Sequence, residues 1–460
     1  MKKTTYLVLL TLFPLVGWGQ CFVKFGGGEN NIIAQKSDGT VWFWGWGANG
    51  QSGLGNSQNQ LLPVLYGNLN QPWLDFNAGY QNTFVIAPNG ALWGSGGNDL
   101  GQLGVGTVQV QYNSPVQVSP GTSWRSVHST AHTLAIQSNG SLWGWGQNNR
   151  GEMGNGTCCN NQLSPIQIGT ATDWKQVQTS ISAACLALKE NGTLWGWGGN
   201  AGRLVSTPSN LVINYPTQIG TDTDWAYLSI GASHALALKQ DGSLWSWGSN
   251  PQGANGTGSS SNVPQRVGTD TWIHISAGLQ HSLGVKTDGT LWAWGRNDFS
   301  QLGDGTTTSR AAPVQIGTDT DWVAVAGGGL HSVGLKSNGS LWSWGRNVYG
   351  QSGNGTTTQS PIPLYVPVEG CVLRVGDFQQ IPLVAYPNPT ADLVSFSVQT
   401  ELDSLELEVY DMMGKKVLQT ELPNGESPFT VSLGHLPQGV YIVTLVQNQR
   451  VLGRQRIVRE

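Results

Sequence analysis

Histidine at one repeated position is the feature of this chain that most resembles a chemical site. Four copies of a recurring phrase carry it, and the matching places in three others hold asparagine or alanine: His132, His234, His281 and His331, against Asn31, Asn82 and Ala184. A complete ring of histidines would suggest a central metal ion. Four, with alanine and asparagine substituting, favour hydrogen bonds to backbone groups instead. We therefore expect no metal ion and no cofactor.

Motifs for catalysis and for other metals are absent from the sequence. It contains no GxSxG, no HExxH and no P-loop. The Thr-Asp-Thr-Asp stretches at 221–224 and 318–321 lack the glycine of a calcium loop, and the cysteines fit no zinc spacing. The sequence thus predicts a protein that is not an enzyme, although residues of different repeats could still meet in space. A secreted hydrolase or lyase remains the alternative from another functional class.

Tryptophan defines the elements that must position these residues. A Leu-Trp or Val-Trp dipeptide recurs 47 to 52 residues apart, at Trp42, Trp93, Trp143, Trp195, Trp245, Trp292 and Trp342. Each copy follows an Asp-Gly or Asn-Gly pair, such as Asp288-Gly289, which is typical of a tight turn between two strands. Four short strands in each of seven repeats predict an all-β fold, a seven-bladed β-propeller.

A second tryptophan follows two residues after the first in every repeat except one. The set is Trp44, Trp145, Trp197, Trp247, Trp294 and Trp344, with Ser95 as the exception. Such a ring could bind sugars or stack on bases. A residue present in almost every blade serves what every blade needs, so we expect these rings to pack between blades.

Binding is expected where the repeats differ. A variable pair of residues lies just after each closing tryptophan strand, in a predicted loop. Aromatic and arginine residues are enriched at interface hot spots. The candidate binding residues are Leu100, Arg150, Phe299 and Tyr349.

The two ends of the chain differ from the repeats. Residues 1–20 carry Lys2 and Lys3, an apolar run too short for a membrane span, and small residues, a pattern typical of a secretory signal peptide. Residues 21–371 hold the repeats, and residues 372–383 form a linker. Residues 384–460 lack tryptophan, and their alternating apolar and polar residues predict the strands of a small immunoglobulin-like β-sandwich. No later stretch could span a membrane as a helix. The net charge of -4 offers no basic surface to nucleic acid.

Export permits disulfides. Cys21 precedes the first repeat and Cys371 follows the last, so closure of a seven-bladed ring predicts a Cys21–Cys371 disulfide. Cys158 and Cys159 are adjacent, a poor geometry for pairing with each other. The sequence leaves open whether Cys185 pairs with either of them.

Two resemblances extend this interpretation. The phrases Ala277-Gly278, His281-Ser282, Leu291-Trp292-Ala293-Trp294-Gly295 and Gln301-Leu302-Gly303 resemble the RCC1 repeat family of seven-bladed propellers, in particular its secreted bacterial members. The C-terminal stretch resembles the type A sorting domain of the type IX secretion system, through these motifs: Tyr386-Pro387-Asn388-Pro389, Val409-Tyr410-Asp411, Gly414-Lys415-Lys416-Val417 and Leu436-Pro437-Gln438-Gly439-Val440-Tyr441.

The resemblances imply a protein that the type IX machinery exports and that is released or held at the cell surface. We expect a module that binds an extracellular protein or a surface glycan. Inhibition of an enzyme, as in inhibitory propellers of this family, is the alternative within the binding class.

Overall fold

The chain divides into two compact units, residues 1–372 and 373–460. The computed structural model describes residues 21–205, 211–367, 384–386, 388, 390–397, 405–411, 416–422, 429–447 and 450–460. The predicted signal peptide (1–20) and linker (372–383) lie outside the described residues, so both stay predictions.

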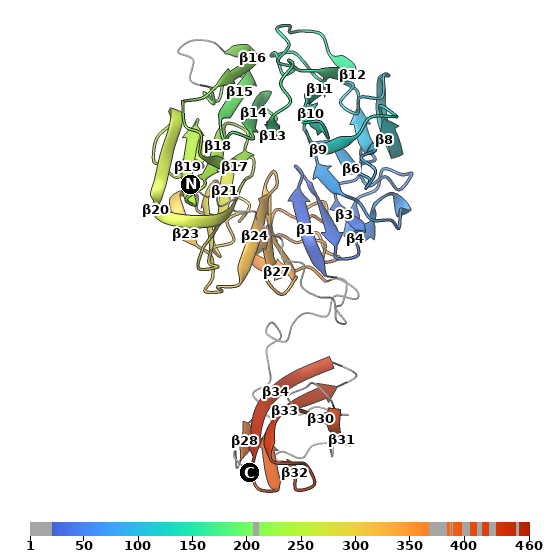
Figure 1. Ribbon diagram of the computed structural model, residues 1–460, viewed down its shortest axis with the longest axis vertical. Helices are drawn as coiled ribbons and strands as arrows, with labels where there is room; N and C mark the ends of the chain where they lie inside the picture. Colours follow the sequence, from blue (N-terminus) through green and yellow to red (C-terminus); the bar gives the residue numbers. More distant parts are fainter. Residues whose placement is uncertain are drawn as a thin grey trace, which may run out of the picture. The chain divides into compact units, whose positions relative to one another are not determined.

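The first unit is the predicted all-β propeller, with seven blades of four antiparallel strands (Figure 1). Blades 1 to 4 consist of β1 (Phe22–Gly27), β2 (Asn31–Lys36), β3 (Val41–Gly45) and β4 (Gln60–Leu65); β5 (Asp75–Ala78), β6 (Asn82–Ile86), β7 (Leu92–Asn98) and β8 (Gln109–Val118); β9 (Trp124–Ser129), β10 (His132–Gln137), β11 (Leu142–Gly146) and β12 (Gln162–Gln167); and β13 (Trp174–Thr179), β14 (Ala184–Lys189), β15 (Leu194–Gly199) and β16 (Val212–Gln218).

Blades 5 to 7 follow in the same order. They consist of β17 (Trp225–Ile230), β18 (His234–Lys239), β19 (Ser243–Gly248) and β20 (Ser261–Ala277); β20 again, with β21 (His281–Lys286), β22 (Leu291–Gly295) and β23 (Arg310–Gln315); and β24 (Trp322–Gly327), β25 (His331–Lys336), β26 (Leu341–Gly345) and β27 (Ser360–Tyr365). Strand β20 is long enough to end blade 5 and begin blade 6. Short 3-10 turns, η1 (Tyr66–Asn68) and η2 (Pro251–Gly253), lie between blades or within loops.

The antiparallel order gives the propeller two different faces. The connections between the first and second and between the third and fourth strands of each blade lie on one face, which we call the loop face. The Asp-Gly and Asn-Gly turns between the second and third strands, and the connections to the next blade, lie on the other, the turn face. Residues of the first strands line the central channel.

Register between the second and third strands is the same in every blade. The repeated histidine position pairs with the glycine after the second tryptophan, or after Ser95 in blade 2, as His281 pairs with Gly295. Gly295 has a φ of +97°, and a Cβ there would lie 2.8 Å from the His281 Cα. Only glycine fits, so the Trp-Gly ending of each phrase is a backbone requirement.

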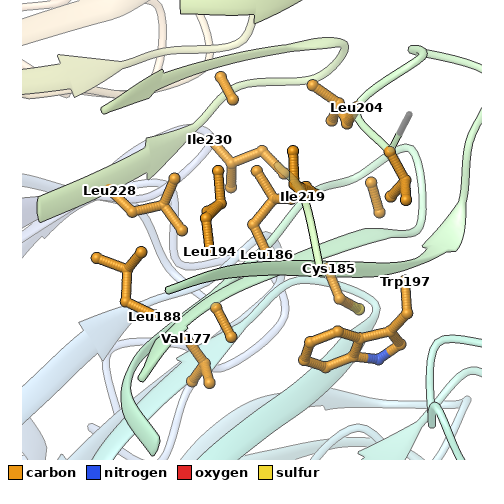
Figure 2. Packing of buried hydrophobic residues seen from close by; sticks show 14 of the residues in the cluster. Val177, Cys185, Leu186, Leu188, Leu194, Trp197, Leu204, Ile219, Leu228 and Ile230 are labelled. Atoms are coloured by element: carbon orange, nitrogen blue, oxygen red, sulfur yellow. The ribbon is translucent and has the colours of Figure 1, made fainter. Parts of the chain in front are cut away.

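The core lies between neighbouring blades. In the cluster of Figure 2, Val177, Leu186 and Leu194 of blade 4 pack near Leu228 and Ile230 of blade 5. Blade 1 packs on blade 7 in the same way: Phe22 and Trp44 share a cluster with Val333 and Leu341. The ring therefore closes by contact of two complete blades, each built from one continuous stretch of chain.

The second unit consists of two sheets around one core. Its strands are β28 (Val384–Tyr386), β29 (Leu393–Ser397), β30 (Leu405–Asp411), β31 (Lys416–Glu421), β32 (Phe429–Ser432), β33 (Gly439–Gln447) and β34 (Arg450–Arg459). One sheet has the order β28-β29-β32 and the other β31-β30-β33-β34. Phe396 and Phe429 of the first sheet join Leu407 and Val443 of the second in a single buried cluster. Its immunoglobulin-like character stays a prediction.

Candidate functional site: an arginine–aromatic ladder on the loop face

The loops that carry the predicted binding residues share one rigid frame. In blade 6 the Asn297 side chain donates to the carbonyl oxygens of Thr306 and Thr308, at 3.0 and 3.1 Å, and accepts from the Leu302 N–H at 3.0 Å. Gln301 Oε1 accepts the Phe299 N–H at 2.9 Å. These bonds fix the backbone, so the variable side chain is presented in a defined direction.

The same frame presents all four predicted residues. The backbone N–H groups of Leu100, Arg150, Phe299 and Tyr349 each donate to a Gln or Glu side chain two residues later, at 2.6 to 2.9 Å. The four residues therefore occupy equivalent positions in blades 2, 3, 6 and 7. Arg150 is exposed, and the other three are half-buried.

The structure brings two of the four together through residues that the sequence analysis did not select. The Arg346 guanidinium carbon lies 5.5 Å from the Phe299 ring centroid and 5.4 Å from that of Tyr349. At one end of this row, the Arg296 guanidinium carbon lies 5.8 Å from the Phe299 ring centroid. At the other end, the ring centroids of Tyr349 and Trp46 are 6.0 Å apart. We call this row the arginine–aromatic ladder; it crosses blades 6, 7 and 1. Contacts that would place Leu100 and Arg150 in the ladder do not occur among the described residues.

Arg296, Arg346 and Trp46 hold one repeat position, directly after each Trp-x-Trp-Gly phrase. The signal that could have found them is a charged or aromatic residue there in three blades that adjoin once the ring is closed. The other blades have Gly97, Gln147, Gly199 and Ser249 at this position. Each cation–π contact of this kind is worth about 0.5–1 kcal/mol at an exposed site.

One ladder residue, Arg346, lies near enough to the central channel for its charge to act on Glu29 of the channel lining. The channel holds a cavity of about 600 Å³, and its lining includes Glu29, Tyr80 and the first strand of every blade. The Tyr80 hydroxyl hydrogen-bonds the Glu29 carboxylate; burial raises the pKa of Glu29, and the Tyr80 hydroxyl and the charge of Arg346 act against that rise. Asp75, the other acid of the lining, pairs with Lys24.

Each histidine of the channel wall uses Nδ1 to accept a backbone N–H from the next blade. His128 Nδ1 accepts the Thr179 N–H at 3.1 Å, and His274 Nδ1 accepts the Val325 N–H at 3.3 Å. Burial lowers the pKa of each to about 4. These imidazoles are therefore neutral near pH 7 and tie neighbouring first strands together.

The four repeated histidines are buried, and their partners differ from our expectation. We expected backbone hydrogen bonds within the strand. Instead the partners lie in the next blade: His234 Nε2 lies 2.9 Å from Ser282 Oγ, and His281 Nε2 lies 2.9 Å from Ser332 Oγ. Backbone partners do occur for His281 and His331, but they too lie in the next blade, at His331 and Asn31. Burial lowers the pKa of His234 to about 4 and that of His281 to about 3. The reason is position: strand backbone groups are already paired in the sheet, so the ring reaches the neighbouring blade.

The second tryptophans pack between blades, as predicted. All six are fully buried. Five donate from Nε1 to a loop carbonyl of the preceding blade, as Trp344 does to Gln301 at 2.9 Å. Where Ser95 replaces tryptophan, the buried Tyr66 lies beside it; its hydroxyl is 2.9 Å from Ser95 Oγ, and Ser95 Oγ donates to the Gln51 carbonyl at 3.2 Å.

A second missed pattern lies on the turn face. Lysines at the end of the second strand lie over tryptophan rings and pair with aspartates. Lys336 Nζ lies 5.1 Å from the Trp322 ring centroid and 5.0 Å from that of Trp342. The same atom is 2.8 Å from Asp319 Oδ2 and 3.1 Å from Asp321 Oδ1. The second Thr-Asp-Thr-Asp stretch thus supplies carboxylates to a lysine. Within the described residues, no group of three His, Cys, Asp or Glu side chains could hold a metal ion.

The cysteines partly answer the question that the sequence left open. Cys158, Cys159 and Cys185 are free thiols, so Cys185 pairs with neither of the other two. Cys185 is buried and lies 3.2 Å from His132 Nε2, whereas Cys158 and Cys159 are exposed. Cys21 is disulfide-bonded. Cys371 lies outside the described residues, so the Cys21–Cys371 pairing stays a prediction.

Comparison with protein families identifies both units. Residues 38–86, 139–185, 241–285, 288–335 and 338–381 match the regulator of chromosome condensation (RCC1) repeat, and residues 384–459 match the secretion system C-terminal sorting domain. A second model of the RCC1 repeat matches at 225–254, 272–301 and 322–351. In the described part of the chain, no helix has the length and apolar character to cross a membrane.

Individual proteins resemble the propeller unit. The Arabidopsis thaliana ultraviolet-B receptor UVR8 is 32% identical over 119 residues, which are 24% of this chain and 25% of that receptor's length. Prp20p of Saccharomyces cerevisiae has 22% identity and a TM-score of 0.64, over 76% of this chain and 88% of that one. Human WBSCR16 has 22% identity and a TM-score of 0.61, over 69% and 87%. At these identities the two structures establish the fold.

Proposed function

The chain belongs to the RCC1 repeat family and carries a sorting domain that directs its export to the cell surface or beyond, and from that premise we propose that it is a binding protein whose loop face holds an extracellular protein. The observation that carries the proposal is the arginine–aromatic ladder. It is the place where side chains suited to an interface gather across three blades.

The contrast with the other repeated residues supports this choice. The second tryptophans are buried between blades, and the repeated histidines form contacts between blades. The ladder residues are half-buried, so each leaves part of its surface available to a partner. Arginine, tyrosine and tryptophan are the residue types most enriched among interface hot spots.

A catalytic role at the channel has less support. Glu29 is bonded to Tyr80 and Asp75 to Lys24, while His128 and His274 accept backbone N–H groups. Groups already engaged in this way are poorly placed to move protons on a substrate. Non-enzymatic binding of a protein is therefore the function that we propose, with inhibition of an enzyme as one form that it could take.

The experiment is affinity capture of cell-surface and culture-medium proteins with the mature chain and two double variants. Phe299→Ala/Tyr349→Ala removes the rings on either side of Arg346. Leu100→Ala/Arg150→Ala changes the equivalent positions of blades 2 and 3 and is the matched control. Proteins held by the wild type and the control but lost by the ladder variant support the proposal; the same capture by all three contradicts it.

A further inference from the structure

Two equivalent arginines of the ladder have different partners. In blade 6, Arg296 donates from Nε and Nη2 to Asp298 Oδ2, at 2.8 and 2.7 Å, and from Nη1 to Gln280 Oε1 at 3.1 Å. In blade 7, Arg346 occupies the same repeat position, but Val348 stands where blade 6 has Asp298. Blade 6 thus supplies a carboxylate to its own arginine, and blade 7 places an exposed valine there.

Arg346 has no substitute for that carboxylate within the described residues. No acid there comes within ion-pair distance of its guanidinium, and its Nε has no hydrogen-bond acceptor. The charge of Arg346 acts on Glu29, but the Glu29 carboxylate is hydrogen-bonded to Tyr80. The guanidinium nevertheless has a defined place, because it lies over the Phe299 and Tyr349 rings. A planar guanidinium held in this way is suited to a carboxylate.

We propose that Arg346 binds the side-chain carboxylate of an aspartate or glutamate on the protein partner, the contact that Asp298 makes with Arg296 inside blade 6. This inference rests on the proposed function and names the chemistry of the partner. The arginine–carboxylate contact within blade 6 is the model for the contact that Arg346 of blade 7 would form with the partner. The partner residue would lie where the Asp298 carboxylate lies in the preceding blade.

The surroundings of Arg346 favour a protein carboxylate over a polyanion. Val348 is 49% exposed, and the Tyr349 and Trp46 rings continue the surface, so the acid would be flanked by apolar contacts. The net charge of the chain is -4, which gives long-range repulsion toward an extended polyanion. A single carboxylate recognised at short range is less affected by that repulsion.

The test uses the mature full chain and four single variants. Val348→Asp places a carboxylate in blade 7 at the position that Asp298 holds in blade 6. Val348→Asn introduces a side chain of nearly the same shape as aspartate but without its charge. Arg346→Gln removes the guanidinium, and Asp298→Val releases Arg296. The probes are a short labelled peptide with one Glu flanked by Leu residues, its counterpart with Gln for that Glu, and a sulfated oligosaccharide. Binding is followed by fluorescence polarisation at low salt. Thermal melting verifies that each variant is folded.

We expect the wild type to bind the Glu peptide about tenfold more tightly than the Gln peptide, the scale of one charge-assisted contact. Val348→Asp and Arg346→Gln should each lose about that factor, while Val348→Asn keeps it. Asp298→Val should bind more tightly than the wild type because it frees a second guanidinium. Equal binding by Val348→Asp and Val348→Asn overturns the inference. So does binding of the sulfated oligosaccharide, but not of the Glu peptide, through Arg346.

Capture experiments separate this inference from the proposed function. If the Phe299→Ala/Tyr349→Ala variant loses the captured proteins and Val348→Asp keeps them, the loop face binds proteins but not through a carboxylate at Arg346. If Val348→Asp loses them and Val348→Asn does not, the carboxylate contact is supported with the natural partner.

Discussion

The two faces of the propeller use the same kinds of contact for different purposes. On the turn face, Lys189, Lys239, Lys286 and Lys336 each lie over two tryptophan rings and pair with aspartates. On the loop face, cation–π contacts join blades 6 and 7, and among the described residues no acid forms an ion pair with Arg346. A contact repeated around the ring serves the blades, whereas one restricted to a few blades is available for a partner.

The comparison predicts that changes on the turn face reduce stability and leave binding unchanged. The largest effect should come from the disulfide of Cys21, which lies at this face beside the Asn338-Gly339 turn. Cys21→Ser should lower the free energy of unfolding by about 4–5 kcal/mol, because the bond would close a loop as long as the propeller. Chemical denaturation measures it.

The control for this prediction is Cys158→Ser/Cys159→Ser, which removes two exposed free thiols and should change the free energy of unfolding little. Reduction of the wild type should reproduce the Cys21→Ser result. Mass spectrometry of the unreduced protein that shows Cys21 and Cys371 both as free thiols would refute the predicted pairing.

The contacts between blades should make stability depend on pH. The pKa of His234 is about 4 in the folded chain, against 6.5 for a free imidazole, so between these values the unfolded chain binds more protons. The stabilising contribution is complete above pH 6.5 and is lost as the pH falls toward 4. The expected slope is about 1.4 kcal/mol per pH unit for each such histidine.

His234→Asn tests this slope with a residue that blades 1 and 2 already use at the same position, Asn31 and Asn82. Between pH 6 and 4.5 the variant should lose less free energy of unfolding than the wild type, by about 1 kcal/mol per pH unit. Parallel curves for the two proteins would show that His234 does not titrate in this range.

The architecture could be predicted from the sequence because it is periodic. The arginine–aromatic ladder could not be predicted, because its residues do not recur in every blade. Trp292, the Asp288-Gly289 turn and His281 recur at fixed spacing, so the blades, their register and the packing role of the second tryptophans follow from the sequence. Tyr349 and Trp46 meet only after the ring closes, about 300 positions apart in the chain. The pairing of Tyr66 with Ser95 compensates for a single irregular blade, so no period reveals it.

A smaller effect is expected from one lysine of the turn face. Lys336→Met keeps the apolar stem over Trp322 and Trp342 and removes the charge. The free energy of unfolding should fall by about 1 kcal/mol, since Asp319 is solvent-exposed and Asp321 is only half-buried, so both ion pairs are screened by solvent. Capture of partner proteins should not change. A loss of capture without a loss of stability would assign a binding role to the turn face and remove the contrast.

The smallest effect on stability should come from the ladder itself. Tyr349→Ala removes a half-buried ring whose contacts are Trp46 and the Arg346 guanidinium, while Asn347 and Gln351 continue to hold the loop backbone. We expect a decrease of about 0.5 kcal/mol in the free energy of unfolding, together with a clear loss of bound partner. Denaturation and capture are measured on the same preparation. A large loss of stability would mean that Tyr349 packs as the turn-face tryptophans do. The ladder would then stabilise the blades, as the turn-face contacts do, and would not be a surface available to a partner.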